Sequence, residues 1–359
     1  MVVASRKIIK RGARIRVLVV DDSVVIRRLV TTALEQEPQL EIVGTAPNGA
    51  AGLARVLQLA PDVITLDIEM PEMSGLEMLR ELRRTNKDVR VIMFSTLTER
   101  GASSTMEALT LGADDYVTKA SNCGALDRSM EALRGELIPK IKQFFTMEGE
   151  APRAAPRRAP AAKALPVTWT MRPQVVAIGV STGGPTALGE ILPQLPAEFP
   201  LPVLIVQHMP SLFTRLLSER LQTSAKVKVV EASAGMEVQP GCVYIALGDY
   251  HMRLQKSGGK TIVTLDQGPR ENSCRPSVDV MFRAAEEIYG GAVISVMLTG
   301  MGYDGLRGAY LIAQDEPSSV VWGMPGSVAS TGLADAVLPL RDVVPEILRR
   351  TAFLKGGKD

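Results

Sequence analysis

The chain has 359 residues, of which 46% are hydrophobic and 22% are charged, and its formal net charge is +2. This length exceeds what one compact core usually holds and favours two domains, whereas the nearly balanced charge gives no general electrostatic signature of a nucleic-acid-binding protein. No signal-peptide core follows the basic residues 5–11, and no apolar stretch reaches membrane-spanning length. We therefore expect a cytoplasmic protein that neither inserts into a membrane nor binds nucleic acid.

The three cysteines, Cys123, Cys242 and Cys274, lie far apart in the sequence. Their dispersal argues against a disulfide framework, and their spacing is not that of zinc ligands. We expect each of them to be a buried or neutral thiol.

Residues 14–138 alternate between strand and helix patterns, after a tail that we assign to residues 1–13. Five such units predict an α/β domain of the doubly wound, flavodoxin-like type, with a parallel sheet and helices on both of its faces. In such sheets, functional residues gather at the carboxyl ends of the strands. The expected strands lie near residues 15–20, 41–45, 63–66, 89–94 and 115–117.

Polar side chains follow four of these strands: Asp21 and Asp22 the first, Asp67 the third, Ser95 the fourth and Lys119 the fifth. Neighbouring carboxylates repel one another unless a hard cation neutralises them, and oxygen ligands of this kind suit Mg²⁺. Asp67 would then act as a nucleophile toward a phosphoryl group. One aspartate at a strand end is more often a solvated helix cap, but suitable residues at successive strand ends favour a phosphorylation site.

These stretches resemble the receiver domain of response regulators. The resemblance implies that Asp67 is the phospho-acceptor, that Asp21 and Asp22 bind the metal together with Asp67, and that Ser95, Tyr116 and Lys119 form the switch. It is carried by residues 17–23 (VLVVDDS), 66–71 (LDIEMP), 75–76 (GL), 93–96 (MFST) and 112–119 (GADDYVTK).

The residue after Lys119 departs from the receiver pattern, since Ala120 stands where receivers usually have a proline, often after a cis bond. A cis bond before alanine costs several kcal/mol more than one before proline. We therefore expect a trans bond or a shifted loop at this position.

Composition changes after a helical segment that reaches about residue 145. Residues 151–162 consist largely of alanine, proline and arginine, and such a segment cannot bury a core. We assign residues 139–172 to a flexible linker and residues 173–355 to a second domain.

The second domain repeats the alternation and predicts another α/β fold with a mostly parallel sheet. Residues 241–265, with a glycine-containing turn at 257–260, predict an antiparallel hairpin insertion. The other expected strands lie near residues 175–178, 203–206, 227–230, 243–246, 293–298 and 320–322, and the expected helices near 186–193, 211–222, 278–289, 304–313 and 341–352.

Ser181 lies at the end of the first of these strands, in a glycine-rich turn. The stretch fits a G-x-S-x-G nucleophile elbow or a phosphate-binding loop at a helix N-terminus. The phosphate loop is the weaker reading, because the lysine of G-x-x-x-x-G-K-[ST] is missing and no acidic residue follows at the spacing of a ribose contact.

A serine nucleophile needs a base, and the chain contains only two histidines. His208 follows an apolar strand, as Ser181 does, whereas His251 falls in the expected hairpin, so we predict His208 as the base. Asp304, in a glycine-rich turn after another apolar strand, is the leading candidate for the carboxylate that orients the imidazole. The alternative order of the α/β-hydrolases would need Asp249 and His251, which are nearly adjacent in sequence.

Backbone N–H groups near these residues complete an acyl-transfer site. Met301 and Gly302 lie in the turn before Asp304, and Thr182 follows the serine. We expect Met301 and Thr182 to donate to the oxyanion.

The two halves together resemble the CheB family of chemotaxis protein-glutamate methylesterases. The resemblance implies a Ser181–His208–Asp304 triad that hydrolyses glutamyl methyl esters on methylated chemoreceptors without a metal and in many members deamidates glutamine. It also implies that the histidine kinase CheA phosphorylates Asp67, which weakens docking of the receiver near the catalytic edge and moves Ser95 and Tyr116 inward. It is carried by residues 177–185 (AIGVSTGGP), 206–210 (VQHMP), 275–279 (RPSVD) and 298–305 (LTGMGYDG).

The sequence leaves two other functional interpretations open. One is a non-enzymatic signalling module in which the receiver drives a binding domain, although the triad residues argue against it. The other is an esterase of the same family that serves receptors outside chemotaxis.

Overall fold

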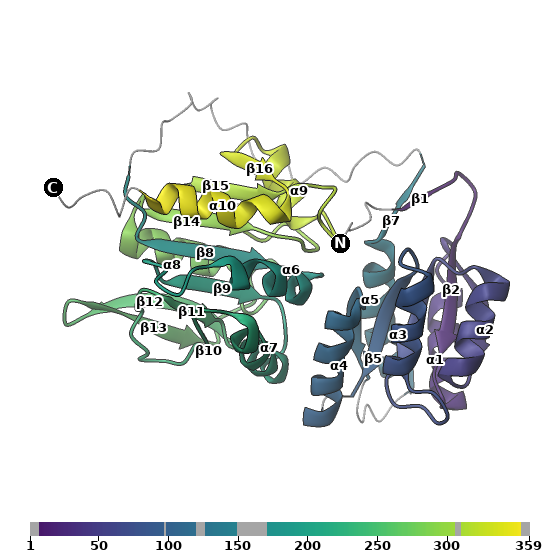
Figure 1. Cartoon of the computed structure of the whole chain (residues 1–359). Helices are drawn as coiled ribbons and strands as arrows, with labels where there is room; N and C mark the ends of the chain where they lie inside the picture. The colour runs from purple at the N-terminus through teal and green to yellow at the C-terminus, as the bar shows by residue number, and fades with distance from the viewer. Residues whose placement is uncertain (1–6, 97, 120–125, 149–170, 306–309, 353–359) are drawn as a thin grey trace. The chain divides into compact units, whose positions relative to one another are not determined.

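Parallel strands alternate with helices in both halves of the chain (Figure 1). The computed structural model describes residues 7–96, 98–119, 126–148, 171–305 and 310–352. These residues fall into two units, one within residues 7–148 and the other within residues 171–352. Ala120 and most of the expected linker lie outside the described residues.

The first unit contains a five-stranded parallel sheet in the order β3-β2-β4-β5-β6. Its strands β2, β4 and β5 are almost wholly buried, as expected for strands covered by helices on both faces. The fold is therefore the predicted flavodoxin-like one. The strands are β2 (Ile15–Val20), β3 (Leu40–Ala46), β4 (Val63–Asp67), β5 (Arg90–Ser95) and β6 (Asp115–Thr118).

Local signals set the start of helices α1 to α4 in this unit. Ser23, Asn48, Ser74 and Thr98 accept hydrogen bonds from backbone N–H groups in the first turns, and Glu77 completes a capping box with Ser74. The caps hold the loops that connect strand ends to helices, where the polar residues lie. The helices are α1 (Val24–Glu35), α2 (Gly49–Leu59), α3 (Gly75–Thr85), α4 (Glu99–Leu111) and α5 (Leu126–Lys142).

Ordered strands extend beyond both expected limits of this domain. Strand β1 (Lys7–Ile9) pairs in parallel with β7 (Phe145–Met147), inside the segments expected as a tail and a linker. Ile9 and Phe145 are buried, so these short strands bury apolar side chains. Three-residue strands are too short to show a periodic pattern in the sequence.

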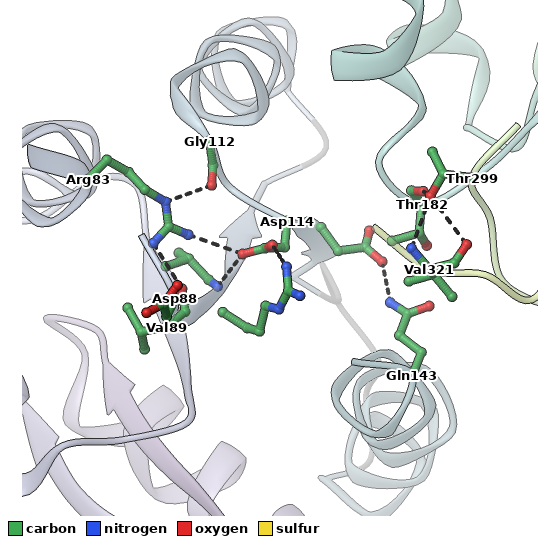
Figure 2. Close-up of polar contacts among 12 residues, drawn as sticks. Arg83, Asp88, Val89, Gly112, Asp114, Gln143, Thr182, Thr299 and Val321 are labelled. Carbon is green, nitrogen blue, oxygen red and sulfur yellow. Dashed lines mark hydrogen bonds and ion pairs between the residues drawn. The ribbon is translucent and has the colours of Figure 1, made fainter. Parts of the chain in front are cut away.

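Asp114 lies at the amino end of β6 and pairs with two arginines, one from α3 and one from the start of β5 (Figure 2). Arg83 and Arg90 lie 3.1 and 2.8 Å from its two carboxylate oxygens, and the Val91 N–H donates to it at 2.8 Å. Arg83 also donates to the carbonyl oxygen of Gly112. Asp114 therefore joins α3 to the sheet at the edge opposite Asp67, which makes its role structural.

The second unit contains a seven-stranded parallel sheet in the order β10-β11-β9-β8-β14-β15-β16. Strand β8 lies between β9 and β14, so the order of the chain reverses at β8. Ligands bind α/β sheets in the crevice at such a point. The strands are β8 (Val175–Val180), β9 (Val203–Gln207), β10 (Lys228–Glu231), β11 (Cys242–Ile245), β14 (Val293–Met297), β15 (Tyr310–Gln314) and β16 (Ala336–Leu338).

A separate antiparallel hairpin, β12 (His251–Ser257) and β13 (Lys260–Asp266), confirms the predicted turn at 257–260. The expected insertion at 241–265 begins too early, because β11 belongs to the main sheet. The helices of this unit are α6 (Gly184–Ile191), α7 (Ser211–Ser224), α8 (Val278–Tyr289), α9 (Met324–Ser330) and α10 (Leu340–Thr351).

Two local predictions in this unit are wrong. The expected helix at 304–313 overlaps β15, whose five residues are all buried, and a short apolar run does not distinguish a buried strand from a helix. The expected strand at 320–322 is reduced to one isolated bridge between Trp322 and Gly300. Helix α9 follows directly and has no counterpart among the predicted helices.

Within the described residues, no helix is long and apolar enough to span a membrane.

Candidate functional site

Ser181 follows β8 directly, and its backbone is fixed on both sides. Its N–H donates to Thr299 O at 3.0 Å, and its carbonyl accepts from Gly184 N at 2.8 Å and from the Gln207 side chain at 2.9 Å. Gly183 has φ +81°, a left-handed conformation that favours glycine. The turn thus sets Ser181 at the carboxyl edge of the sheet, immediately before α6.

Thr299, in the loop after β14, connects this turn to the segment around Val321. Its hydroxyl donates to Thr182 O at 3.0 Å and accepts from Val321 N at 3.0 Å (Figure 2). Thr299 is 1% exposed, so these contacts are shielded from water. They fix the backbone that follows Ser181.

His208 lies at the corresponding end of the neighbouring strand β9. The backbone N–H of His208 donates at 3.2 Å to the carbonyl oxygen of Val180, the residue before Ser181. Its Nε2 atom lies 3.0 Å from Asp304 Oδ2. The adjacency of β8 and β9 thus brings the expected base to the edge that carries the serine, and Nδ1 is the ring nitrogen that does not face Asp304.

Asp304 is buried and accepts four hydrogen bonds besides the contact with His208. Two come from backbone N–H groups at the start of α8, where a carboxylate is also favoured by the helix dipole. Because every donor fixes its orientation, Asp304 can position the imidazole. The donors are Val278 N at 2.5 Å, Asn272 Nδ2 at 2.8 Å, Ser277 Oγ at 2.9 Å and Asp279 N at 3.1 Å.

The pKa values of His208 and Asp304 are shifted in opposite directions. Burial would lower the pKa of His208, but the contacts with Asp304 and Cys274 outweigh burial and raise the pKa to about 9. Burial would raise the pKa of Asp304, but its hydrogen bonds to His208, Asn272 and Val278 lower it. Both shifts favour an imidazolium–carboxylate pair.

The Met301 N–H makes no hydrogen bond among the described residues, and Met301 is 42% exposed. This amide lies in the turn between Thr299 and Asp304. It can therefore donate to an oxyanion formed near Ser181.

The sequence did not indicate the contacts that several residues of this site make. Cys274 Sγ lies 3.6 Å from His208 Nδ1, and Asn272 and Ser277 bind Asp304. His251 is buried in β12, where its Nδ1 accepts from Ser277 N and its Nε2 lies 2.9 Å from Pro269 O. Only the RPSVD stretch at 275–279 marked this segment as part of the site. Its residue types did not indicate that Ser277 binds Asp304.

In the first unit, Asp67 lies at the end of β4 and is paired with a lysine. Lys119 Nζ lies 2.7 Å from Asp67 Oδ2 and 3.0 Å from Asp21 Oδ2. Burial raises the pKa of Asp67, the hydrogen bond and charge of Lys119 oppose this, and the Asp21 charge adds to it, so the net shift is upward. A cavity of about 230 Å³ opens beside Asp67, lined also by Asp22 and Lys119.

The three carboxylates of this edge suit a hard cation. Asp21, Asp22 and Asp67 each offer an oxygen, and these atoms lie within 4.8 Å of one another. An all-oxygen set of this kind fits Mg²⁺.

Ser95 and Tyr116 are both buried, and Ser95 contacts α4. Ser95 Oγ lies 2.6 Å from Thr105 Oγ1 on α4 and donates to Gly101 O at 3.1 Å. Tyr116 is 6% exposed, and burial raises its pKa well above the usual value. The two residues of the expected switch thus lie inside the domain, and their movement on phosphorylation stays a prediction.

Comparisons with known proteins identify both halves. Residues 176–347 match the family model of CheB methylesterases, and residues 17–131 match that of response regulator receiver domains. A Nocardioides protein named protein-glutamate methylesterase/protein-glutamine glutaminase is 51% identical over 94% of this chain and 96% of its own length. A protein of the same name from Trichodesmium erythraeum is 46% identical over 94% of this chain and 99% of its own length.

Among solved structures, the catalytic domain of Thermotoga maritima CheB methylesterase is 43% identical, with a TM-score of 0.48. The match covers 50% of this chain and 99% of that one.

Proposed function

The chain belongs to the CheB methylesterase family, and we propose that Ser181, His208 and Asp304 carry out its ester hydrolysis. It is a protein-glutamate methylesterase and protein-glutamine glutaminase whose receiver domain places the activity under phosphorylation control. The observation that best supports the triad is the 3.0 Å contact between His208 Nε2 and a buried, fully hydrogen-bonded Asp304, at the sheet edge that also carries Ser181.

Ser181 attacks the ester carbonyl while His208 accepts its proton through Nδ1, the ring nitrogen that does not face Asp304. No hydrogen bond joins Ser181 Oγ to His208 within the described residues; such bonds often tighten only when substrate is bound. Asp304 stabilises the imidazolium that forms.

The tetrahedral intermediate places a negative charge on the former carbonyl oxygen, which accepts from the N–H groups of Met301 and Thr182. Collapse of the intermediate expels methanol, which takes the proton from His208. Water then attacks the acyl-enzyme by the same route and releases glutamate. When glutamine is the substrate, ammonia is the leaving group in place of methanol. This chemistry needs no metal ion.

The substrates that we propose are methylated chemoreceptors, and the phosphodonor is the histidine kinase CheA. Receiver domains bind Mg²⁺ at their phosphorylation site, where the ion neutralises charge on the phosphoryl oxygens; here Asp21, Asp22 and Asp67 would hold it. Asp67 accepts the phosphoryl group, and Lys119 pairs with its oxygens. Ser95 would then exchange its contact with Thr105 for one with the phosphoryl group.

The test is methanol release from methylated receptor membranes by the full chain carrying Ser181→Ala. We expect release to fall to the background rate, while phosphorylation of Asp67 by a small-molecule phosphodonor continues. Preserved phosphorylation shows that the receiver domain is folded, and a thermal unfolding profile equal to that of the wild type shows that the catalytic domain is folded. Methanol release at the wild-type rate would refute Ser181 as the nucleophile.

A further inference from the structure

The fold brings Cys274 to the catalytic histidine, although the two residues are far apart in sequence. Cys274 Sγ lies 3.6 Å from His208 Nδ1, and Cys274 is only partly buried. The other ring nitrogen of His208 lies 3.0 Å from Asp304 Oδ2. The imidazole thus has a thiol at one nitrogen and a carboxylate at the other.

These contacts match the surroundings of a zinc-binding histidine. With a Zn–S bond of about 2.3 Å and a Zn–N bond of about 2.0 Å, tetrahedral geometry separates the two ligand atoms by about 3.5 Å. The 3.6 Å between Cys274 Sγ and His208 Nδ1 leaves room for an ion bound to both. A metal-ligating histidine also usually donates its other N–H to a carboxylate, as His208 can to Asp304.

Asp304 fits the role of supporting carboxylate better than that of ligand. Ligand atoms of His208, Cys274 and Asp304 lie within 4.8 Å of one another. Asp304, however, already accepts hydrogen bonds from α8 and from Asn272 and is 2% exposed. A move onto an ion would break these bonds, so two protein ligands remain and water completes the coordination.

We propose that His208 Nδ1 and Cys274 Sγ form an inhibitory site for Zn²⁺ or a similar borderline-soft divalent cation. Binding releases the thiol proton and occupies the nitrogen that must accept the Ser181 proton. Thiolate and imidazole ligands select such ions over Mg²⁺, so excess Mg²⁺ leaves this site free. The effect on activity rests on the proposed function, but metal binding does not.

The dispersed cysteines predicted no zinc site, because spacing along the sequence does not report residues that folding brings together. Of the thiols that we predicted to be buried or neutral, Cys242 is buried and Cys274 is partly exposed. Cys123 lies outside the described residues.

The experiment titrates the full chain with Co²⁺ and then Zn²⁺, in excess Mg²⁺ and a reductant that contains no thiol. Co²⁺ should produce a thiolate-to-cobalt absorption band that saturates at one equivalent, and Zn²⁺ should abolish it. Methanol release should fall as the ion binds. Cys274→Ser should lose the band and, relative to its own metal-free rate, need at least about tenfold more Zn²⁺ for half-inhibition.

The matched control is Cys242→Ser, which changes a buried thiol on β11 and should leave the band unchanged. A band that survives in Cys274→Ser, or equal zinc sensitivity of that variant and the wild type, would overturn the proposal. So would a wild-type protein that binds Co²⁺ through Cys274 yet is not inhibited. If the wild type lacked esterase activity but showed the band, the metal site would stand and the proposed function would fail.

Discussion

Asp67 is the last residue of β4, and Asp304 lies in the loop that follows β14, so both belong to the carboxyl side of a parallel sheet but have opposite surroundings. Both are buried, at 5% and 2% exposure. Asp67 accepts hydrogen bonds from Lys119 and from Ile68 N beside an open cavity, and the pKa of its carboxyl is raised. Asp304 is surrounded by five donors, and the pKa of its carboxyl is lowered.

The difference separates a carboxylate that reacts from one that orients. A nucleophile needs a lone pair that an incoming group can reach, and Asp67 has one facing the cavity. An orienting group needs every oxygen fixed, as those of Asp304 are. The surroundings of a carboxylate, and not its position near a strand end, therefore determine whether it reacts or orients a neighbour.

Among changes to the two carboxylates and their neighbours, the largest expected effect comes from Asp304→Asn. An amide cannot hold the imidazole in the required tautomer or stabilise its protonated form, so methanol release should fall by about 10⁴-fold, as when a triad aspartate is replaced elsewhere. Phosphorylation of Asp67, measured on the same protein, should not change. A loss of less than about tenfold would contradict the orienting role of Asp304.

Asp67→Asn tests the other carboxylate. The variant should accept no phosphoryl group and lose all stimulation by a phosphodonor, while its basal methanol release stays at the wild-type level because the triad is intact. Phosphate incorporation and methanol release are measured with and without the donor. Stimulation that persists in Asp67→Asn would break the link between the two sites.

A smaller effect is expected for Ser277→Ala, which removes one of the five donors to Asp304. The loss of a hydrogen bond to a charged group costs about 1.5 kcal/mol or more, so methanol release should fall by about tenfold. The matched control is Ser295→Ala on β14, since the buried Ser295 hydroxyl has no hydrogen-bond partner in the described chain. Equal rates for the two variants would contradict a positioning role for Ser277.

The pH profile should show the smallest change. His208 must be neutral to accept a proton, and its pKa is raised to about 9, so kcat/KM should rise with pH up to about 9. Burial lowers this pKa and the contacts with Asp304 and Cys274 raise it; Cys274→Ser should therefore shift the rising limb to lower pH. A limb that does not move would show that Cys274 does not affect His208.

The fold and much of the site could be predicted from the sequence because both depend on local patterns. Apolar runs that end in Ser181, His208 and Asp67 place these residues at strand ends without any knowledge of the tertiary structure. The contact of Cys274 with His208 depends on how the segment before α8 packs, which no local pattern records. The helix expected at 304–313 was wrong for a related reason, since only the sheet shows that β15 is buried on both faces.

The central claim is that Ser181, and not the thiol of Cys274 beside His208, forms the covalent intermediate. The most direct test is peptide mass spectrometry of the full chain after acid quenching during turnover of a methylated receptor substrate. The account predicts a glutamyl adduct on the peptide that contains Ser181, absent from Ser181→Ala. An adduct on Cys274, or turnover with no adduct on Ser181 in a burst-phase sample, would contradict it.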